Sequence, residues 1–92
     1  MGKFRFKRGV PLAYDVQGYV YFVSRRYSQL PATKRRQIDD LCRKAGGEYA
    51  PALKEFVTTS TGAEEICNKY FLSASTLERM VKRYYLGFAE NL

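Results

Sequence analysis

The sequence predicts an all-α fold: a compact bundle of about five short helices that ends in a C-terminal helix-turn-helix. Three observations predict it. Apolar residues recur at helical spacing in successive short segments, with prolines and glycines between them. Apolar residues make up 46% of the chain, which is a globular rather than a disordered composition. The length of 92 residues leaves room for one hydrophobic core and therefore for one domain.

The first nine residues are expected to form a basic N-terminal arm ahead of a single helical domain that covers residues 10–92. The arm carries four cations and no acid: Lys3, Arg5, Lys7 and Arg8. We therefore expect residues 1–9 to be a mobile basic arm. Phe4 and Phe6 leave open the alternative that the arm packs back onto the domain.

Residues 16–29 are compatible with a strand or a helix. Their β-branched and aromatic content favours a strand. The spacing of the apolar residues favours a helix, since one helical face contains Val16, Tyr19, Val20, Val23, Tyr27 and Leu30. Asp15 is placed to cap the first turn, whereas Gly18 costs about 1 kcal/mol in a helix interior. Apart from the arm, the chain offers no partner strand of similar quality, so we predict a helix.

Two further helices follow, and each has start and stop signals. Pro31 begins the first, and Gly46–Gly47 end it. Its apolar stripe is Ile38, Leu41, Cys42 and Ala45. Pro51 is tolerated in the first turn of the second helix, whose apolar face is Tyr49, Ala52, Leu53, Phe56 and Val57. The polar stretch TTSTG ends this helix and offers caps for the next one.

The stretch AEEICNKYFLSASTLERMVKRY, residues 63–84, contains two helical patterns separated by a few residues that fit neither. A helix-turn-helix over about residues 63–86 accounts for it, because two helices joined by a short turn need apolar residues at fixed places. The inward residues of the first helix are Ile66, Cys67 and Tyr70, of which Cys67 is the small residue at the closest approach. Leu72 fills the turn, and Leu77 and Met80 anchor the second helix.

This stretch resembles a bacterial and phage helix-turn-helix pattern in which EEIA, a turn ending in IS, and STV followed by R recur. The matching pieces are EEIC (64–67), LS (72 and 73) and STLERMVKR (75–83). At the end of a small all-α domain, the arrangement is most similar to sigma-factor region 4-like modules and to the small phage or mobile-element transcriptional regulators built on them. The resemblance covers roughly a quarter of the chain.

The turn departs from that pattern at Phe71, where glycine is common. Glycine suits this place because the backbone there tends toward positive φ. Phe71 therefore predicts either backbone strain in a turn of the usual kind or a slightly longer turn of another kind.

The resemblance implies that the second helix of the pair lies in the major groove of DNA. Its outward residues are Ser73, Ala74, Ser75, Thr76, Glu78, Arg79, Lys82 and Arg83. Ser73 is a natural N-cap. Ser75 and Thr76, in the first turn, are placed to bond phosphates or base edges. The alternative is a solvated helix face of mixed charge.

The charged residues of this face have separate expected roles. Arg79 lies near the middle of the helix, where a guanidinium reaches O6 and N7 of guanine. Lys82 and Arg83 are expected to contact phosphates. Glu78 either accepts a hydrogen bond from cytosine N4 or, as we favour, pairs with Lys82 four residues on.

Other basic residues are less specific candidates for contact with the DNA backbone. One group lies at the start of a helix, which is unfavourable for the helix dipole unless an anion compensates it: Lys34, Arg35 and Arg36. The arm, with Lys3, Arg5, Lys7 and Arg8, is a candidate for the backbone or for a minor groove. Further candidates are Arg25, Arg26, Arg43 and Lys44. Plain solvation is equally compatible with each of them.

Composition excludes several other classes of function. Sixteen Lys and Arg against nine Asp and Glu give a net charge of +7, which favours a polyanion as partner. The longest apolar run, YVYFV, is far too short to cross a membrane, and we expect a cytoplasmic protein with Cys42 and Cys67 reduced. The chain contains no histidine and no Gly-rich phosphate loop, and Asp39 and Asp40 point apart on a helix. We therefore expect no metal, no cofactor, no small-molecule substrate and no catalytic activity.

These features predict sequence-specific binding of double-stranded DNA, in transcriptional regulation of a phage or mobile element. One helix-turn-helix reads only a few base pairs, so a homodimer or a contact with RNA polymerase is expected. Two other hypotheses stay open. One is a helical adaptor that binds polymerase or a phage protein, and the other is the DNA-recognition subunit of a packaging terminase, which would form a ring-like oligomer.

Overall fold

The computed structural model describes residues 4–91, which contain five α-helices and no strand. The helices are α1 (Tyr14–Arg25), α2 (Ala32–Gly46), α3 (Ala50–Thr58), α4 (Ala63–Tyr70) and α5 (Ala74–Ala89). Short 3₁₀ turns, η1 (Tyr27–Gln29) and η2 (Gly47–Tyr49), precede α2 and α3. The predicted all-α bundle is confirmed. None of the helices within residues 4–91 has the length and hydropathy that a bilayer span requires.

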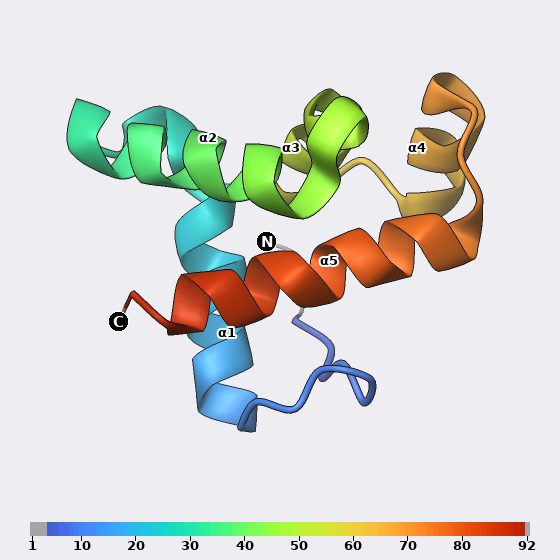
Figure 1. Ribbon diagram of the computed structural model, residues 1–92. Helices are drawn as coiled ribbons and strands as arrows, with labels where there is room; N and C mark the ends of the chain where they lie inside the picture. The colour runs from blue at the N-terminus through green and yellow to red at the C-terminus, as the bar shows by residue number, and fades with distance from the viewer. Residues whose placement is uncertain (1–3, 92) are drawn as a thin grey trace.

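Helix α5 lies at the centre of the bundle and contacts each of the other four helices. Figure 1 shows α2 and α3 above α5, α1 crossing behind it, and α4 beside its N-terminal end. The buried side chains of α5 are Leu77, Met80, Val81, Tyr84, Tyr85 and Phe88. They follow helical spacing along nearly the whole helix, so only one face of α5 is left for solvent or a partner.

Helix α1 is a helix, as predicted, and Val20 and Val23 of the predicted stripe contact the core, but the most buried face is rotated toward Gln17 and Ser24. Its buried residues are Gln17, Val20 and Ser24, whereas Tyr19 is 48% exposed. The predicted cap is also wrong, because Ala13 is the N-cap residue and Asp15 lies inside the first turn. The helix ends at Arg25, so the last part of the predicted stripe falls in and after η1.

The polar residues on the buried face of α1 each have hydrogen-bond partners. The side chain of Ser24 pairs with the hydroxyl of Tyr84 at 2.6 Å, a contact between residues sixty positions apart. The amide of Gln17 donates to the carbonyl oxygens of Lys7, Val10 and Leu12 at 3.0–3.1 Å and accepts from the N–H of Lys7 at 2.8 Å. A buried polar group is stable when it is satisfied in this way.

The N-terminal segment, residues 4–12, packs onto the domain, which corrects the expectation of a mobile arm. Gln17 holds its backbone, and the Phe4 ring lies 5.5 Å from the ring of Tyr14 and 5.3 Å from that of Tyr21. The Phe4 ring also lies beside Gly18, where an added Cβ would be 3.8 Å from it, an ordinary van der Waals distance. Lys3 lies outside the described residues.

Helices α2 and α3 match their predicted faces. In α2 the buried residues are Ile38, Cys42 and Ala45, and in α3 they are Ala52, Leu53 and Val57. Gly47 ends α2 with a φ of +56°, a conformation that glycine adopts without strain. Cys42 and Cys67 are both free thiols, and burial raises the pKa of Cys42 to about 12.

Candidate nucleic-acid interface

Helices α4 and α5 are joined by residues 71–73 and pack through the predicted apolar residues. Ile66 in α4 is fully buried, and Leu77 and Met80 in α5 are each only 2% exposed. Cys67, Tyr70 and Leu72 are half-buried and pack against the same core. The predicted apolar register of this helix pair is therefore confirmed. The N-cap residue of α4, Gly62, comes from TTSTG as expected, although it provides no side-chain hydrogen bond.

The turn between the two helices is short and contains a left-handed residue. Phe71 has φ 57° and ψ 48°, and the N–H of Leu72 donates to the carbonyl of Cys67 at 3.1 Å, across Phe71. Of the two outcomes predicted for Phe71, backbone strain in a short turn is the one observed. Its side chain is 91% exposed, so no packing offsets that strain.

Replacing Phe71 by glycine is expected to stabilise the protein. Glycine adopts left-handed φ and ψ without the Cβ clash, which is worth about 1 kcal/mol. For a domain of this size the melting temperature would rise by about 4–8 °C. Thermal unfolding followed by circular dichroism measures it. Phe71→Ala is the control, since it removes the ring but keeps the Cβ; an equal rise in both variants would contradict the strain explanation.

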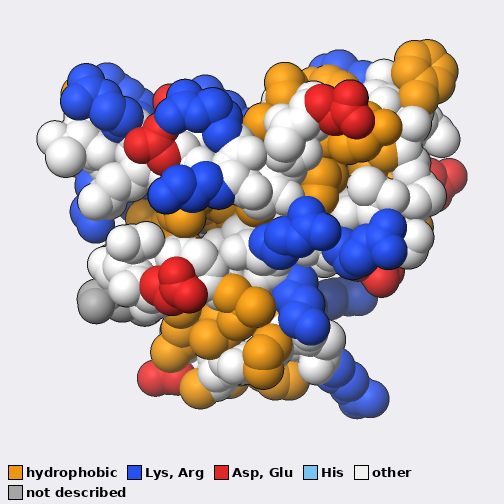
Figure 2. Space-filling view, in the orientation of Figure 1, with side chains coloured by type: hydrophobic (Ala, Val, Ile, Leu, Met, Phe, Trp, Pro, Cys, Tyr) orange, Lys and Arg blue, Asp and Glu red, His pale blue; other side chains and the backbone are white. Residues whose placement is uncertain are grey.

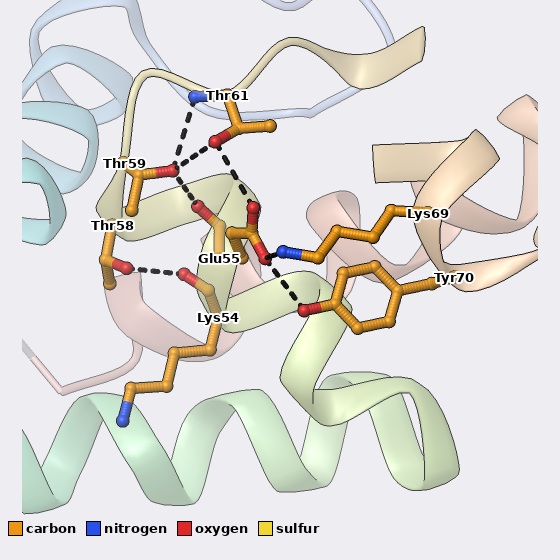
Figure 3. A network of polar contacts seen from close by, with 7 residues as sticks. All are labelled: Lys54, Glu55, Thr58, Thr59, Thr61, Lys69 and Tyr70. Carbon is orange, nitrogen blue, oxygen red and sulfur yellow. Dashed lines mark hydrogen bonds and ion pairs between the residues drawn. The ribbon is translucent and has the colours of Figure 1, made fainter. Parts of the chain in front are cut away.

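A polar network centred on Glu55 holds α4 against α3 (Figure 3). The Glu55 carboxylate accepts from Lys69 Nζ at 2.8 Å, from the Tyr70 hydroxyl at 2.7 Å and from the Thr61 hydroxyl at 3.3 Å. The hydrogen bond from Lys69, and then that from Tyr70, lowers the pKa of Glu55 below its usual value. The network is therefore intact at neutral pH and weakens only as the pH falls through that lowered pKa. It also neutralises Lys69, which lies at the end of α4.

Ser73 is the N-cap of α5, as predicted. Its hydroxyl accepts from the N–H of Thr76 at 3.2 Å and lies 2.8 Å from the Thr76 hydroxyl. The predicted outward residues Ala74 and Ser75 are exposed, whereas Thr76 is half-buried. The start of α5 is thus fixed by its own serine and threonine, and Ser75 presents its side chain to solvent.

The charged residues predicted to face outward are exposed, although two of them differ from expectation. Glu78, Arg79, Lys82 and Arg83 are all exposed. Within the described chain Glu78 makes no ion pair with Lys82, so the favoured pairing is not formed. Arg83 donates to the carbonyl of Ala45 at 3.1 Å, which caps the end of α2 and removes that donor from any phosphate contact.

A groove of about 570 Å³ runs between α5 and the N-terminal segment. Ser75, Arg79 and Lys82 line one side, and Lys7 and Arg8 line the other. The remaining lining includes the apolar Val10, Phe56, Leu77 and Val81 and one acid, Glu78. Figure 2 shows the Lys and Arg side chains that gather over the middle of α5. The structure therefore brings part of the predicted arm next to the predicted recognition face.

The other backbone candidates are dispersed. Arg5 and Arg8 are exposed, whereas Lys7 is half-buried with its Nζ 5.5 Å above the ring of Tyr85. Arg35 donates to the carbonyl of Leu30 at 2.6 Å. Lys34 and Arg36 do not line the groove, and the N-terminal ends of α2 and α5 lie on opposite sides of the molecule (Figure 1). These α2 cations therefore form a separate basic patch.

The fold and this surface define an all-α domain whose central helix exposes a basic face beside a short turn. Comparison with protein-family models, with curated proteins and with solved structures finds no match for this chain. Among the described residues no cluster of His, Cys, Asp or Glu could hold a metal ion. Function is therefore inferred from the contacts and charges of the chain itself.

Proposed function

We propose that this protein binds double-stranded DNA with the N-terminal half of α5 in the major groove. The observation that carries the proposal is the groove beside α5, where Arg79 and Lys82 face Lys7 and Arg8 and no ion pair within residues 4–91 neutralises any of the four. Cations left without partners on one surface attract a polyanion. The net charge of +7 extends this attraction over the whole molecule.

The packing of α5 limits which residues reach DNA. Beyond Arg83, α5 is covered: a Cβ on Gly87 would lie 3.0 Å from a methyl carbon of Leu41 in α2. The open part of α5 is its outer face from Ala74 to Arg83. Arg79 is the residue placed to read a base edge, with Lys82 and Arg8 on phosphates. The resemblance of EEIC (64–67) and STLERMVKR (75–83) to the phage and bacterial helix-turn-helix pattern supports a role in transcriptional regulation in a phage or mobile element.

A protein-binding surface is the second candidate, because α1 and the N-terminal segment expose several aromatic side chains. The exposed aromatic residues are Phe6, Tyr14, Tyr19 and Phe22. Figure 2 shows hydrophobic side chains gathered over this part of the molecule. Such a surface fits a second copy of the chain, RNA polymerase or a phage protein. Light scattering separates a monomer or dimer from the ring-like oligomer of a terminase subunit.

Titration of a random-sequence duplex at 50 and 200 mM salt tests the proposal. Each phosphate contact steepens the fall of log K with log salt by about 0.9, so the two contacts proposed for Lys82 and Arg8 weaken binding roughly 12-fold over this range. We expect a loss of that size. Absence of binding at 50 mM, or binding that is insensitive to salt, would rule out DNA as the partner and favour the adaptor. Selection from a random library would then determine whether the binding is sequence-specific.

A further inference from the structure

A second, smaller cavity of about 190 Å³ lies among α1, the segment between α3 and α4, and the middle of α5. Lys7 and Phe56 line both this cavity and the groove beside α5. The polar residues around the cavity include Lys7, Tyr21, Arg25, Ser60, Thr61 and Tyr85. No carboxylate is among the described residues that line it. A cavity with two cations and no acid is suited to an anion.

The two cations have no acidic partner. Neither Lys7 nor Arg25 forms an ion pair with an acid of the described chain. The Lys7 amino group is held over the Tyr85 ring, and burial lowers its pKa, which reflects the cost of keeping a charge there without a counter-ion. Glu55, bonded to Thr61, already accepts from Lys69 and Tyr70 and does not line the cavity.

The geometry around Arg25 fixes its guanidinium at the cavity. One nitrogen donates to the Tyr21 hydroxyl at 2.7 Å, and the other donates to the Ser60 hydroxyl at 2.9 Å. These two bonds leave further N–H donors of the guanidinium unused, since arginine has five. The arginine is thus positioned ahead of any ligand, which reduces the entropy that binding would cost.

The hydroxyl of Tyr85 is an uncharged hydrogen-bond donor at the same cavity. Its side chain is only 3% exposed, and its hydroxyl makes no hydrogen bond to another described residue. Burial raises its pKa well above the ordinary value, so the hydroxyl keeps its proton. No buried polar side-chain atom of the described residues lacks a hydrogen-bond partner, so this unbonded hydroxyl is open to the cavity, where a ligand or water can bond it. A cavity that joins this donor to two cations offers an oxyanion three distinct contacts.

We propose that this cavity binds a phosphate group, held by Lys7, Arg25 and the hydroxyl of Tyr85. A guanidinium and an ammonium around a small polar cavity match the charge and the oxygen acceptors of phosphate. The phosphate belongs either to a DNA backbone that passes along the groove, which Lys7 also lines, or to a free phosphate compound. The recognising chemistry is the same in both cases.

Inorganic phosphate tests the second source. Melting temperature is followed against phosphate concentration, with sodium chloride added to keep the ionic strength constant. We expect a saturable rise for the wild type that is lost in Lys7→Met and in Arg25→Gln, and reduced in Tyr85→Phe. Lys7→Met keeps the apolar stem over Tyr85 and so separates the charge from the packing. Arg26→Gln, an equal loss of charge at an exposed neighbour outside the cavity, is expected to keep the full rise.

Duplex binding tests the first source with the same variants. If the phosphate is part of DNA, Lys7→Met and Arg25→Gln each weaken binding by more than Arg26→Gln does and lower the salt slope by about one. The site is supported if Lys7→Met and Arg25→Gln lose the phosphate response, or if they lose more duplex affinity than Arg26→Gln does. The phosphate site is overturned if Lys7→Met and Arg25→Gln, with unchanged circular dichroism, keep the phosphate response and lose no more duplex affinity than Arg26→Gln does. Should the wild type bind no duplex, the proposed function fails, and the phosphate titration alone decides this cavity.

Discussion

Replacing Gln17 by leucine is expected to lower the free energy of unfolding by about 3 kcal/mol and to release the N-terminal segment. The Gln17 amide makes four hydrogen bonds, all to backbone groups of Lys7, Val10 and Leu12. Leucine fills a similar volume but leaves the Lys7 N–H and the Leu12 carbonyl unpaired, whereas the carbonyls of Lys7 and Val10 still accept from the N–H groups of Val10 and Leu12. Each buried group left unpaired costs about 1–3 kcal/mol. The unpaired groups can regain water only if the segment leaves α1. Urea denaturation gives the loss of stability, and tryptic cleavage after Arg8 reports the release.

Gln37→Leu provides the matched control for this variant. It makes the same chemical change on α2, at a position that is exposed. We expect its stability to stay within about 0.5 kcal/mol of the wild type and its rate of tryptic cleavage to be unchanged. If Gln17→Leu were as stable as Gln37→Leu, the glutamine would not be what anchors residues 4–12.

The second large effect is expected in DNA binding, from the double variant Arg79→Ala, Lys82→Ala. Both side chains are exposed on the open face of α5 and both line the groove. A base-edge contact is worth about 1–3 kcal/mol, and 1.4 kcal/mol is tenfold in affinity. We therefore expect duplex binding at 50 mM salt to weaken roughly 100-fold. The salt slope should fall by between about one and two.

The comparison pair is Lys34→Ala, Arg36→Ala, which removes the same charge from the start of α2. That helix end is exposed and lies away from the start of α5 (Figure 1). Its loss affects only the long-range attraction, so we expect less than about a fivefold weakening. Equal losses from both pairs would mean that net charge, and not the α5 face, determines binding. Neither pair should lower the stability, since all four residues are exposed.

The sequence predicted those parts of the fold that depend on regular apolar spacing. Ile38, Cys42, Leu53 and Ile66 are buried where periodicity placed them, because apolar side chains need no particular partner. The face of α1 could not be predicted in the same way. Gln17 is buried by carbonyl groups of a segment without regular structure, and Ser24 is buried by a tyrosine sixty positions away. Apolar periodicity contains no signal for either contact.

The sequence likewise predicted only those parts of the candidate site that depend on local patterns. Capping preference identified Ser73, and subtraction of the buried stripe identified the exposed Arg79 and Lys82. Contacts between distant segments were not predictable, such as the bond from Arg83 to the carbonyl of Ala45. The position of Lys7 beside α5 was hidden for the same reason, because it depends on how Gln17 holds the N-terminal segment.

The central place of α5 has a consequence for synthesis on the ribosome. This helix contacts all four others and contributes Tyr84, whose hydroxyl reaches back to α1. A nascent chain that stops before the turn at Phe71 has its other helices but lacks the side chains around which they pack. We expect such a chain to stay unfolded until α5 has left the exit tunnel. No stalled or shortened product would then present a folded domain that lacks the helix proposed to contact DNA, so incomplete chains are open to proteases instead of competing for partners.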